Sequence, residues 1–425
     1  MKVIIIGGGW AGCSAALEAV KLGAEVELYE RTDLLLGVGN VGGIMRNNGR
    51  YTAAEELINL GAGDFIRIMD SIAIHKNIDF PEHKHAWLCD IGKAEPIVRR
   101  YLIECGVKIF LQSRTIDVNM EGNKIKSLVL FNKDIVTGDV FVETTGSTGS
   151  MPNCVKYGNG CVMCTLRCPS FGARVSISSK AGVNDLVGER ANGMKGAMSG
   201  SCEFPRESLS KDIIKELEKN GVVVIPIPKE DIHLEKLEQK VCQQYATLEF
   251  AENIILLDTG RVKLMTSHYP LDKLRKIKGL ENVVYIDPLV GGNGNSIRYL
   301  CAAPRYNSMQ VNGVENLFCG GEKSGFFVGH TEAMTTGTLA GYNAVQYLEK
   351  KPLLELPREL ATGDIIAYAN DKVKEGKMSE RYTFSGAEYF ERMKDLGLYS
   401  INNDEIRSRV KKLNLTNVFS KQCKN

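Results

Sequence analysis

The first thirty residues combine two apolar runs with a glycine-rich turn. Residues 2–6 form a short, mostly apolar run that is typical of a buried parallel strand, and Gly7-Gly-Gly9-Trp-Ala-Gly12 follows it directly. An alanine-rich stretch and a second strand-like run come next, and that run ends at Glu30. A strand, Gly-x-Gly-x-x-Gly, a helix, a second strand and a terminal acid in this order predict the first unit of a dinucleotide-binding domain.

Each part of this unit is expected to contact a different part of the cofactor. The first glycine permits the tight turn, the second lets the backbone approach a pyrophosphate, and the third lets the helix pack on the sheet. The helix N-terminus would stabilise the phosphate charge, and the terminal acid would accept hydrogen bonds from an unphosphorylated ribose. The candidate cofactor-binding residues of this unit are Gly7, Gly9, Trp10, Ala11, Gly12, Glu30 and Arg31.

Two later segments decide which dinucleotide is expected. Residues 314–325 contain Gly320-Gly-Glu322-Lys-Ser-Gly325 and precede a helix of small residues at 328–344, while residues 139–147 contain Thr-Thr-Gly146-Ser. With these segments the chain resembles the FAD-dependent oxidoreductases that have a glutathione-reductase-like FAD domain, and within them the GidA/TrmFO group. The resemblance covers roughly residues 1–150 and 275–347.

The resemblance implies FAD as cofactor and an α/β fold. A Rossmann-like FAD-binding domain, with a parallel sheet in three layers, would comprise residues 1–150 and 285–347. An inserted α+β substrate domain would occupy residues 151–284, and a short helical extension residues 348–425. The late glycine turn would close over the ribityl and pyrophosphate part of FAD, and a glycine-dense loop after the second strand would lie against the flavin ring. The resemblance thus adds Gly42, Gly43, Gly146, Gly321, Glu322 and Gly325 to the cofactor-binding residues.

Local patterns predict several further elements. Apolar spacing predicts amphipathic helices over residues 53–70 and 93–105. Within the middle region it predicts a helix near 208–219 and strands that begin at Val222 and Ile254. That region contains no second strand and Gly-x-Gly-x-x-Gly turn with a trailing acid or arginine. A nicotinamide domain of the glutathione-reductase type is therefore not expected.

Four cysteines within fifteen residues carry the clearest chemical signal of the middle region: Cys154, Cys161, Cys164 and Cys168. The Cys-x2-Cys-x3-Cys-Pro spacing is similar to the end of a bacterial ferredoxin run, but Cys154 lies too far upstream for the full pattern. Zinc sites normally have paired Cys-x2-Cys units, and only one is present here. Redox or nucleophilic thiols, an iron–sulfur cluster, zinc and buried structural cysteines all remain open, and no metal is assigned.

The candidate catalytic residues are Cys161, Cys164, Cys168 and His330. Arg167-Cys168-Pro-Ser resembles an Arg-x-Cys-Pro-Ser segment of the GidA group, which implies an active-site thiol at Cys168; the partner cysteine of that group is replaced by Gly37. His330 precedes the late helix and either lies against the flavin, as neutral imidazole or cation, or donates a hydrogen bond at the helix start. His83 and His85, with Cys89, are expected to be a solvated surface cluster rather than metal ligands.

Composition places limits on the environment and the partners. No apolar run approaches the length of a membrane span, and twelve cysteines without a secretory signal suggest a reducing, cytoplasmic location. The net charge of +2 gives no obvious RNA footprint, although the last 25 residues carry +4. We expect a homo-oligomeric FAD-dependent oxidoreductase that acts on a small-molecule substrate or a redox partner protein. The alternatives are a folate-linked enzyme that modifies uridine in tRNA or rRNA, as the resemblance implies, and a non-enzymatic electron-transfer subunit.

Overall fold

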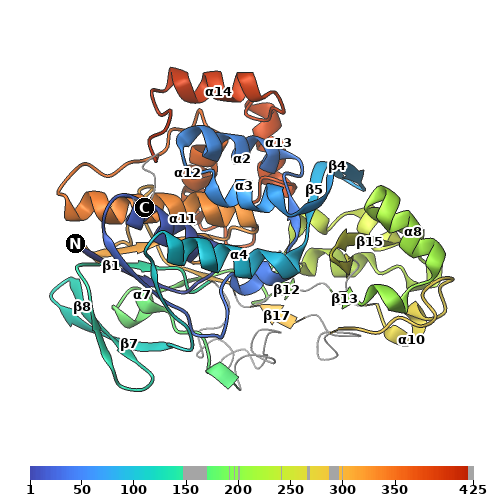
Figure 1. The fold of residues 1–425 in the computed structure, drawn as a ribbon, viewed down its shortest axis with the longest axis horizontal. Helices are drawn as coiled ribbons and strands as arrows, with labels where there is room; N and C mark the ends of the chain where they lie inside the picture. The colour runs from blue at the N-terminus through green and yellow to red at the C-terminus, as the bar shows by residue number, and fades with distance from the viewer. Residues whose placement is uncertain are drawn as a thin grey trace.

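The larger part of the molecule is built on a five-stranded sheet whose strands are all parallel (Figure 1). The computed structural model describes residues 1–146, 170–190, 192–195, 197–199, 202–240, 242–265, 269–286, 296–298 and 300–419. The sheet has the order β19 (Leu317–Cys319), β10 (Val140–Glu143), β1 (Lys2–Ile6), β2 (Glu25–Tyr29) and β6 (Lys108–Phe110).

Both faces of this sheet are covered, which explains the apolar run of the first strand. Val3 and Ile5 belong to the core shared with helices α1 (Trp10–Lys21) and α11 (His330–Leu348), whereas Ile4 and Ile6 belong to a second core on the opposite face. An antiparallel meander covers that second face, made of β7 (Thr115–Glu121), β8 (Lys124–Leu130) and β9 (Ile135–Thr137). The three layers confirm the predicted Rossmann-like α/β fold.

Helices α1 and α11 pack very closely because small residues line their contact. A Cβ atom added at Gly337 would lie 2.1 Å from the Ala11 carbonyl oxygen, and one at Gly341 would lie 2.3 Å from that of Ala15. Only glycine can occupy these two positions without moving the helices apart. This contact brings the first and the late glycine turns, which are about three hundred positions apart in the sequence, to the same end of the sheet.

The helix predicted over residues 53–70 is wrong as a single element. The structure has α2 (Gly49–Leu60) and α3 (Asp64–Ser71), and Gly61 ends the first of them in a left-handed conformation with φ of 95°. The carbonyls of the last turn of α2 are capped there, so the chain changes direction before Asp64. The helix predicted over 93–105 is confirmed as α4 (Ile91–Glu104). Asp90 caps its N-terminus, because the Asp90 side chain accepts a hydrogen bond from the Gly92 amide.

The middle region forms a separate antiparallel sheet with helices, as predicted. Its strand order is β13 (Cys202–Phe204), β16 (Arg261–Leu264), β15 (Asn253–Thr259) and β14 (Val222–Pro226). Helices α8 (Lys211–Asn220) and α10 (Leu271–Leu274) bury apolar side chains on the sheet, and Ser210 caps α8. Figure 1 shows this unit at the right, beside the hairpin of β4 and β5.

Short elements connect these parts. A three-stranded antiparallel sheet contains β3 (Ile44–Met45), β5 (His83–Cys89) and β4 (Ala73–Phe80). The remaining strands are β11 (Leu186–Val187), β12 (Ala197–Ser199), β17 (Ser296–Arg298) and β18 (Cys301–Ala302). The short helices are α7 (Ile177–Lys180), α9 (Leu248–Glu252) and the 3-10 turns η1 (Gly37–Val41), η2 (Arg206–Ser208), η3 (Lys229–Asp231), η4 (Leu234–Gln239), η5 (Gln243–Tyr245) and η6 (Gly321–Ser324).

The C-terminal extension contributes three helices that share the core of the cofactor domain. They are α12 (Ala361–Lys374), α13 (Ala387–Asp395) and α14 (Asn403–Lys412), and they lie beside α2 (Figure 1). The buried Glu56 carboxylate of α2 accepts hydrogen bonds from the amides of Ala361 and Thr362, at 3.0 and 2.8 Å. In the described part of the chain, every helix is too short or too polar to span a bilayer.

Candidate cofactor and active site

The first glycine turn is shaped by backbone contacts that exclude side chains. Gly7 has φ of +101°, and a Cβ atom there would lie 2.5 Å from the Thr144 carbonyl oxygen. A Cβ atom at Gly12 would lie 1.9 Å from the Gly7 carbonyl oxygen, so α1 packs directly on the turn. At Gly9 the situation differs, because an added Cβ atom would meet nothing within 4 Å. The turn therefore leaves open space at the one glycine that was predicted to face a pyrophosphate.

The start of α1 has the features of an anion site. Gly9 is its N-cap residue, no side chain of the described residues caps the helix, and its first turn contains no acid. Trp10 is only 4% exposed, and its indole Nε1 has no hydrogen-bond partner in the described structure. Uncapped amides and the positive end of the helix dipole favour a phosphate at this position. Together with the open space at Gly9, they fit the pyrophosphate of FAD.

Glu30 follows β2 and is fixed beside the glycine turn. Its Oε2 accepts a hydrogen bond from the Gly8 amide at 2.7 Å, and its Oε1 accepts from the amide and the hydroxyl of Thr32 at 2.8 and 2.9 Å. This position suits the predicted role toward a ribose. Arg31 contacts another part of the chain: its Nη1 donates a hydrogen bond to the carbonyl of Gly172 at 2.5 Å. Gly172 belongs to the segment that follows the cysteine-rich stretch.

The late glycine turn meets the first one across α1. Gly321, with φ of +67°, would place a Cβ atom 2.9 Å from the Cβ of Ala11, and its amide donates to the Thr336 hydroxyl at 2.8 Å. Glu322 lies in the same turn, η6, and Gly325 ends it. Gly146, with φ of +75°, follows β10, the strand next to β1. These predicted residues are thus gathered at the carboxyl ends of neighbouring parallel strands, where α/β proteins bind their ligands.

The glycine-dense loop, residues 37–43, is enclosed by four other segments. A Cβ atom at Gly39 would lie 2.4 Å from the Trp10 indole nitrogen, and one at Gly42 would lie 1.8 Å from the His330 ring. Gly43, with φ of +97°, contacts Ile91 and also Thr259 of the inserted domain, each within 3 Å of an added Cβ. The loop therefore joins α1, α11 and the inserted sheet in one place.

His330 is the first residue of α11 and faces this loop. Its Nδ1 lies 3.4 Å from the Met45 sulfur, and its ring centre lies 5.8 Å from that of Trp10. Burial, and then the charges of Arg50 and Lys263, lower the pKa of His330 to about 3. The imidazole is therefore neutral at physiological pH, which removes the cationic alternative that the sequence left open.

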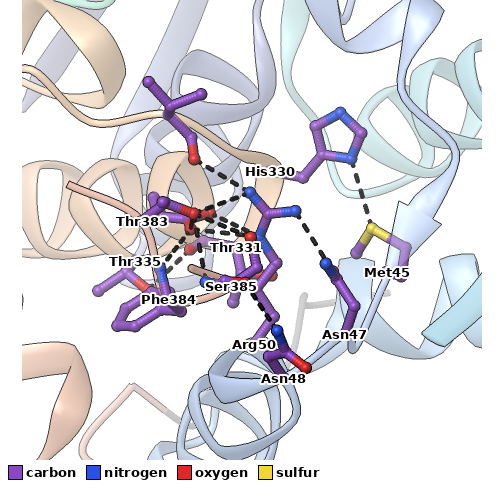
Figure 2. A network of polar contacts seen from close by, with 12 residues as sticks. Met45, Asn47, Asn48, Arg50, His330, Thr331, Thr335, Thr383, Phe384 and Ser385 are labelled. Atoms are coloured by element: carbon purple, nitrogen blue, oxygen red, sulfur yellow. Dashed lines mark hydrogen bonds and ion pairs between the residues drawn. The ribbon is translucent and has the colours of Figure 1, made fainter. Parts of the chain in front are cut away.

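Beneath the start of α11 lies a buried polar network that the sequence did not reveal (Figure 2). Arg50 of α2 and Glu332 of α11 form an ion pair with an Nε to Oε1 distance of 3.2 Å. Thr383 and Phe384, from the C-terminal extension, donate to the same carboxylate oxygen at 2.8 Å each. Arg50 also donates to the Val328 carbonyl at 3.0 Å. Two distant segments, α2 and residues 383–384, thus fix the position of the helix that carries His330.

Two predictions about cysteine and histidine have different outcomes. Cys154, Cys161, Cys164 and Cys168 lie outside the described residues, and within the described ranges no group of three or more potential ligands could hold a metal ion. The expected surface position of His83 is wrong, since this residue is 1% exposed. Its Nδ1 contacts the Asn47 amide at 2.9 Å and its Nε2 the Gln244 carbonyl at 3.2 Å. It packs among aromatic rings, including Phe80 and Tyr245.

Comparison with known proteins identifies the family. The family model described as Glucose inhibited division protein A matches residues 2–255 and 243–352. The chain belongs to the Glucose inhibited division protein A family. Membership confirms the resemblance to the GidA-like group of FAD-dependent oxidoreductases, and with it the predictions of an enzyme and of FAD as cofactor. It provides no support for an iron–sulfur cluster.

Solved structures agree on the fold. The structure of Aquifex aeolicus GidA in its form II crystal superposes with a TM-score of 0.69 at 16% identity, covering 99% of this chain and 74% of that one. Its form I crystal gives a TM-score of 0.61, also at 16% identity, with 97% and 78% covered. At this level of identity the likeness shows the fold alone.

Curated relatives match only part of the chain. Zeta-carotene desaturase of Synechocystis sp. is 29% identical over 143 residues, which is 32% of this chain and 28% of that protein. The tRNA uridine 5-carboxymethylaminomethyl modification enzyme MnmG of Desulfotalea psychrophila is 28% identical over 138 residues, or 32% of this chain and 19% of that protein. The matched region spans less than a third of either relative.

Proposed function

We propose that this protein binds FAD between its first and late glycine turns and uses it to oxidise or reduce a substrate presented by the inserted domain. The observation that carries this proposal is the open space at Gly9 beside the uncapped start of α1, with Gly321 of the late turn packed against Ala11. A dinucleotide phosphate is the ligand that suits uncapped helix amides whose own first turn contains no acid.

The residues of this chain would bind and orient the cofactor. The α1 N-terminus would hold the pyrophosphate, Glu30 a ribose, and residues 37–43 would lie against the flavin ring. FAD, when bound, supplies hydride or electron transfer. His330, neutral and partly buried between Gly42 and Met45, would limit the access of water and offer one ring nitrogen as a hydrogen-bond acceptor or donor.

Absorbance of the purified protein tests this proposal. We expect flavin bands in the protein as isolated or after incubation with FAD, and bleaching of these bands under anaerobic reduction. A protein that stays colourless after incubation with FAD would contradict the proposal. Screening candidate reductants and substrates for reoxidation or reduction of the bound flavin would then define the reaction, because the bands report each half-reaction separately.

A second candidate function is the modification of uridine in tRNA or rRNA. It is supported by the family, by the name of the MnmG relative, and by exposed basic residues on α14. Arg407, Lys411 and Lys412 are all exposed on this helix, where they could contact phosphates. RNA affinity that falls steeply with salt, and that weakens when these three residues are replaced by Gln, would favour this function. A purified protein that fails to bind tRNA or rRNA at low salt would set it aside.

A further inference from the structure

Lys263 is a buried ammonium group that reaches from the inserted domain to the glycine-dense loop. Lys263 lies on β16 and is 5% exposed, and its Nζ donates a hydrogen bond to the Val41 carbonyl. In contrast, Val41 is 48% exposed. The buried lysine therefore binds the backbone of a loop residue that stays open to solvent.

No carboxylate among the described residues lies within ion-pair distance of this ammonium. Glu203 pairs with Lys263 across the β13–β16 ladder, but its Oε2 binds Arg261 at 3.2 Å and its Oε1 has no hydrogen-bond partner in the described structure. Burial lowers the pKa of Lys263, and Glu203, Cys242 and Cys202 only partly oppose this effect. An isolated buried cation is costly, so a negative charge beside it would be stabilised.

On the side of the glycine-dense loop, the described groups near Lys263 offer no such charge. His330, on the other side of Gly42, is neutral, and the charge of Glu332 is taken by Arg50. The indole Nε1 of Trp10 is a second buried group near the loop, and it has no hydrogen-bond partner in the described chain. A cation and an unsatisfied donor near one loop together favour a ligand that is electron-rich at this point.

We propose that Lys263 stabilises the negative charge that the flavin ring gains when FAD is reduced, and thereby raises the reduction potential of the bound cofactor. This inference rests on the proposed function, which puts the flavin ring against residues 37–43. Charge near the ring is one of the means by which a protein tunes its cofactor. Because the lysine belongs to the inserted domain, the potential would also depend on how that domain is seated on the loop.

A potentiometric titration of the FAD-loaded protein tests the proposal. In Lys263→Met, the affinity for reduced FAD relative to oxidised FAD should fall about tenfold. This corresponds to a reduction potential that is about 30 mV lower for a two-electron couple. Lys263→Arg should restore most of the potential. Lys215→Met removes an exposed lysine of α8 in the same domain and should leave the potential unchanged.

The outcomes separate the two claims. A wild-type reduction potential in Lys263→Met would overturn this inference. If Lys263→Met does not fold by circular dichroism, Lys263→Gln, which is shorter but retains a hydrogen-bond donor at its end, is measured in the same way. Failure of the wild-type protein to bind FAD would remove the proposed function as well, whereas an unchanged potential leaves that function intact.

Discussion

Arg50 and Glu332 are 282 positions apart in the chain, yet Arg50 Nε lies 3.2 Å from Glu332 Oε1 in the interior of the protein. Burial by itself would lower the pKa of Arg50, but the Glu332 carboxylate raises it, so the guanidinium stays charged. Because Glu332 is in the first turn of α11, the pair fixes the helix that carries His330 and thus one side of the candidate site.

Removing either partner of this pair should be strongly destabilising. Arg50→Met leaves a buried carboxylate without its cation, and a cost of about 3–5 kcal/mol in the free energy of unfolding is expected. Denaturant unfolding measures the change. Lys84→Gln is the control, since Lys84 and Asp79 form an exposed ion pair whose loss should cost no more than about 1 kcal/mol. Equal losses in the two variants would contradict the structural role of the buried pair.

His83 should make stability depend on pH. Its pKa is lowered to about 3 by burial and then by the Arg50 charge, while the unfolded chain titrates near 6.5. The unfolded chain therefore binds more protons below pH 6.5, and the stability contributed by neutral His83 is lost as pH falls from 6.5 toward 3. Between pH 7 and pH 5 this loss is about 2 kcal/mol.

Urea unfolding at these two pH values, for the wild type and for His83→Gln, measures that contribution. The variant cannot gain a proton at this position, so its stability should fall less on acidification, by about the same 2 kcal/mol. Carboxylates affect both proteins alike and cancel in the comparison. An identical pH dependence in the two proteins would show that His83 gains its proton at the same pH in the folded and the unfolded chain, which contradicts the lowered pKa.

The cysteine cluster should add electrons to those taken up by the flavin if it acts as thiols. A redox pair among Cys161, Cys164 and Cys168 would bring the uptake from the fully oxidised protein to about four electrons per chain, against two for flavin alone. Cys168→Ser should retain bound FAD but lose turnover. Metal analysis of anaerobically purified protein is the companion measurement, because stoichiometric iron would replace the thiol hypothesis with a cluster.

The parts of the fold that follow from local sequence were predictable. A Cβ atom at Gly12 would clash with the Gly7 carbonyl oxygen within one strand, turn and helix, so the Gly-x-Gly-x-x-Gly spacing in that context indicates the turn. The end of α2 was missed although Gly61 marks it, because apolar spacing continues across the break to Asp64. Local periodicity therefore predicts whether a segment is a helix or a strand more reliably than it predicts where that element begins and ends.

Contacts between distant segments could not be predicted in this way. Lys263 looks like a surface lysine in a strand, and only the packing of the inserted sheet on the glycine-dense loop buries it. His83 was expected in a solvated surface cluster with His85, whereas Phe80, Tyr245 and Phe250 surround it in the fold.

The affinity of the protein for FAD, measured by titration of wild type and Gly9→Ala, tests the central claim most directly. Gly9 has φ of −66° and open space around it, so alanine fits the folded backbone and stability should hardly change. The methyl group of the alanine would occupy the position of the pyrophosphate, so FAD should bind at least tenfold more weakly. As a control, the Gly92→Ala variant, changed in α4, should bind FAD as the wild type does. Wild-type affinity in Gly9→Ala would contradict a cofactor held at the start of α1.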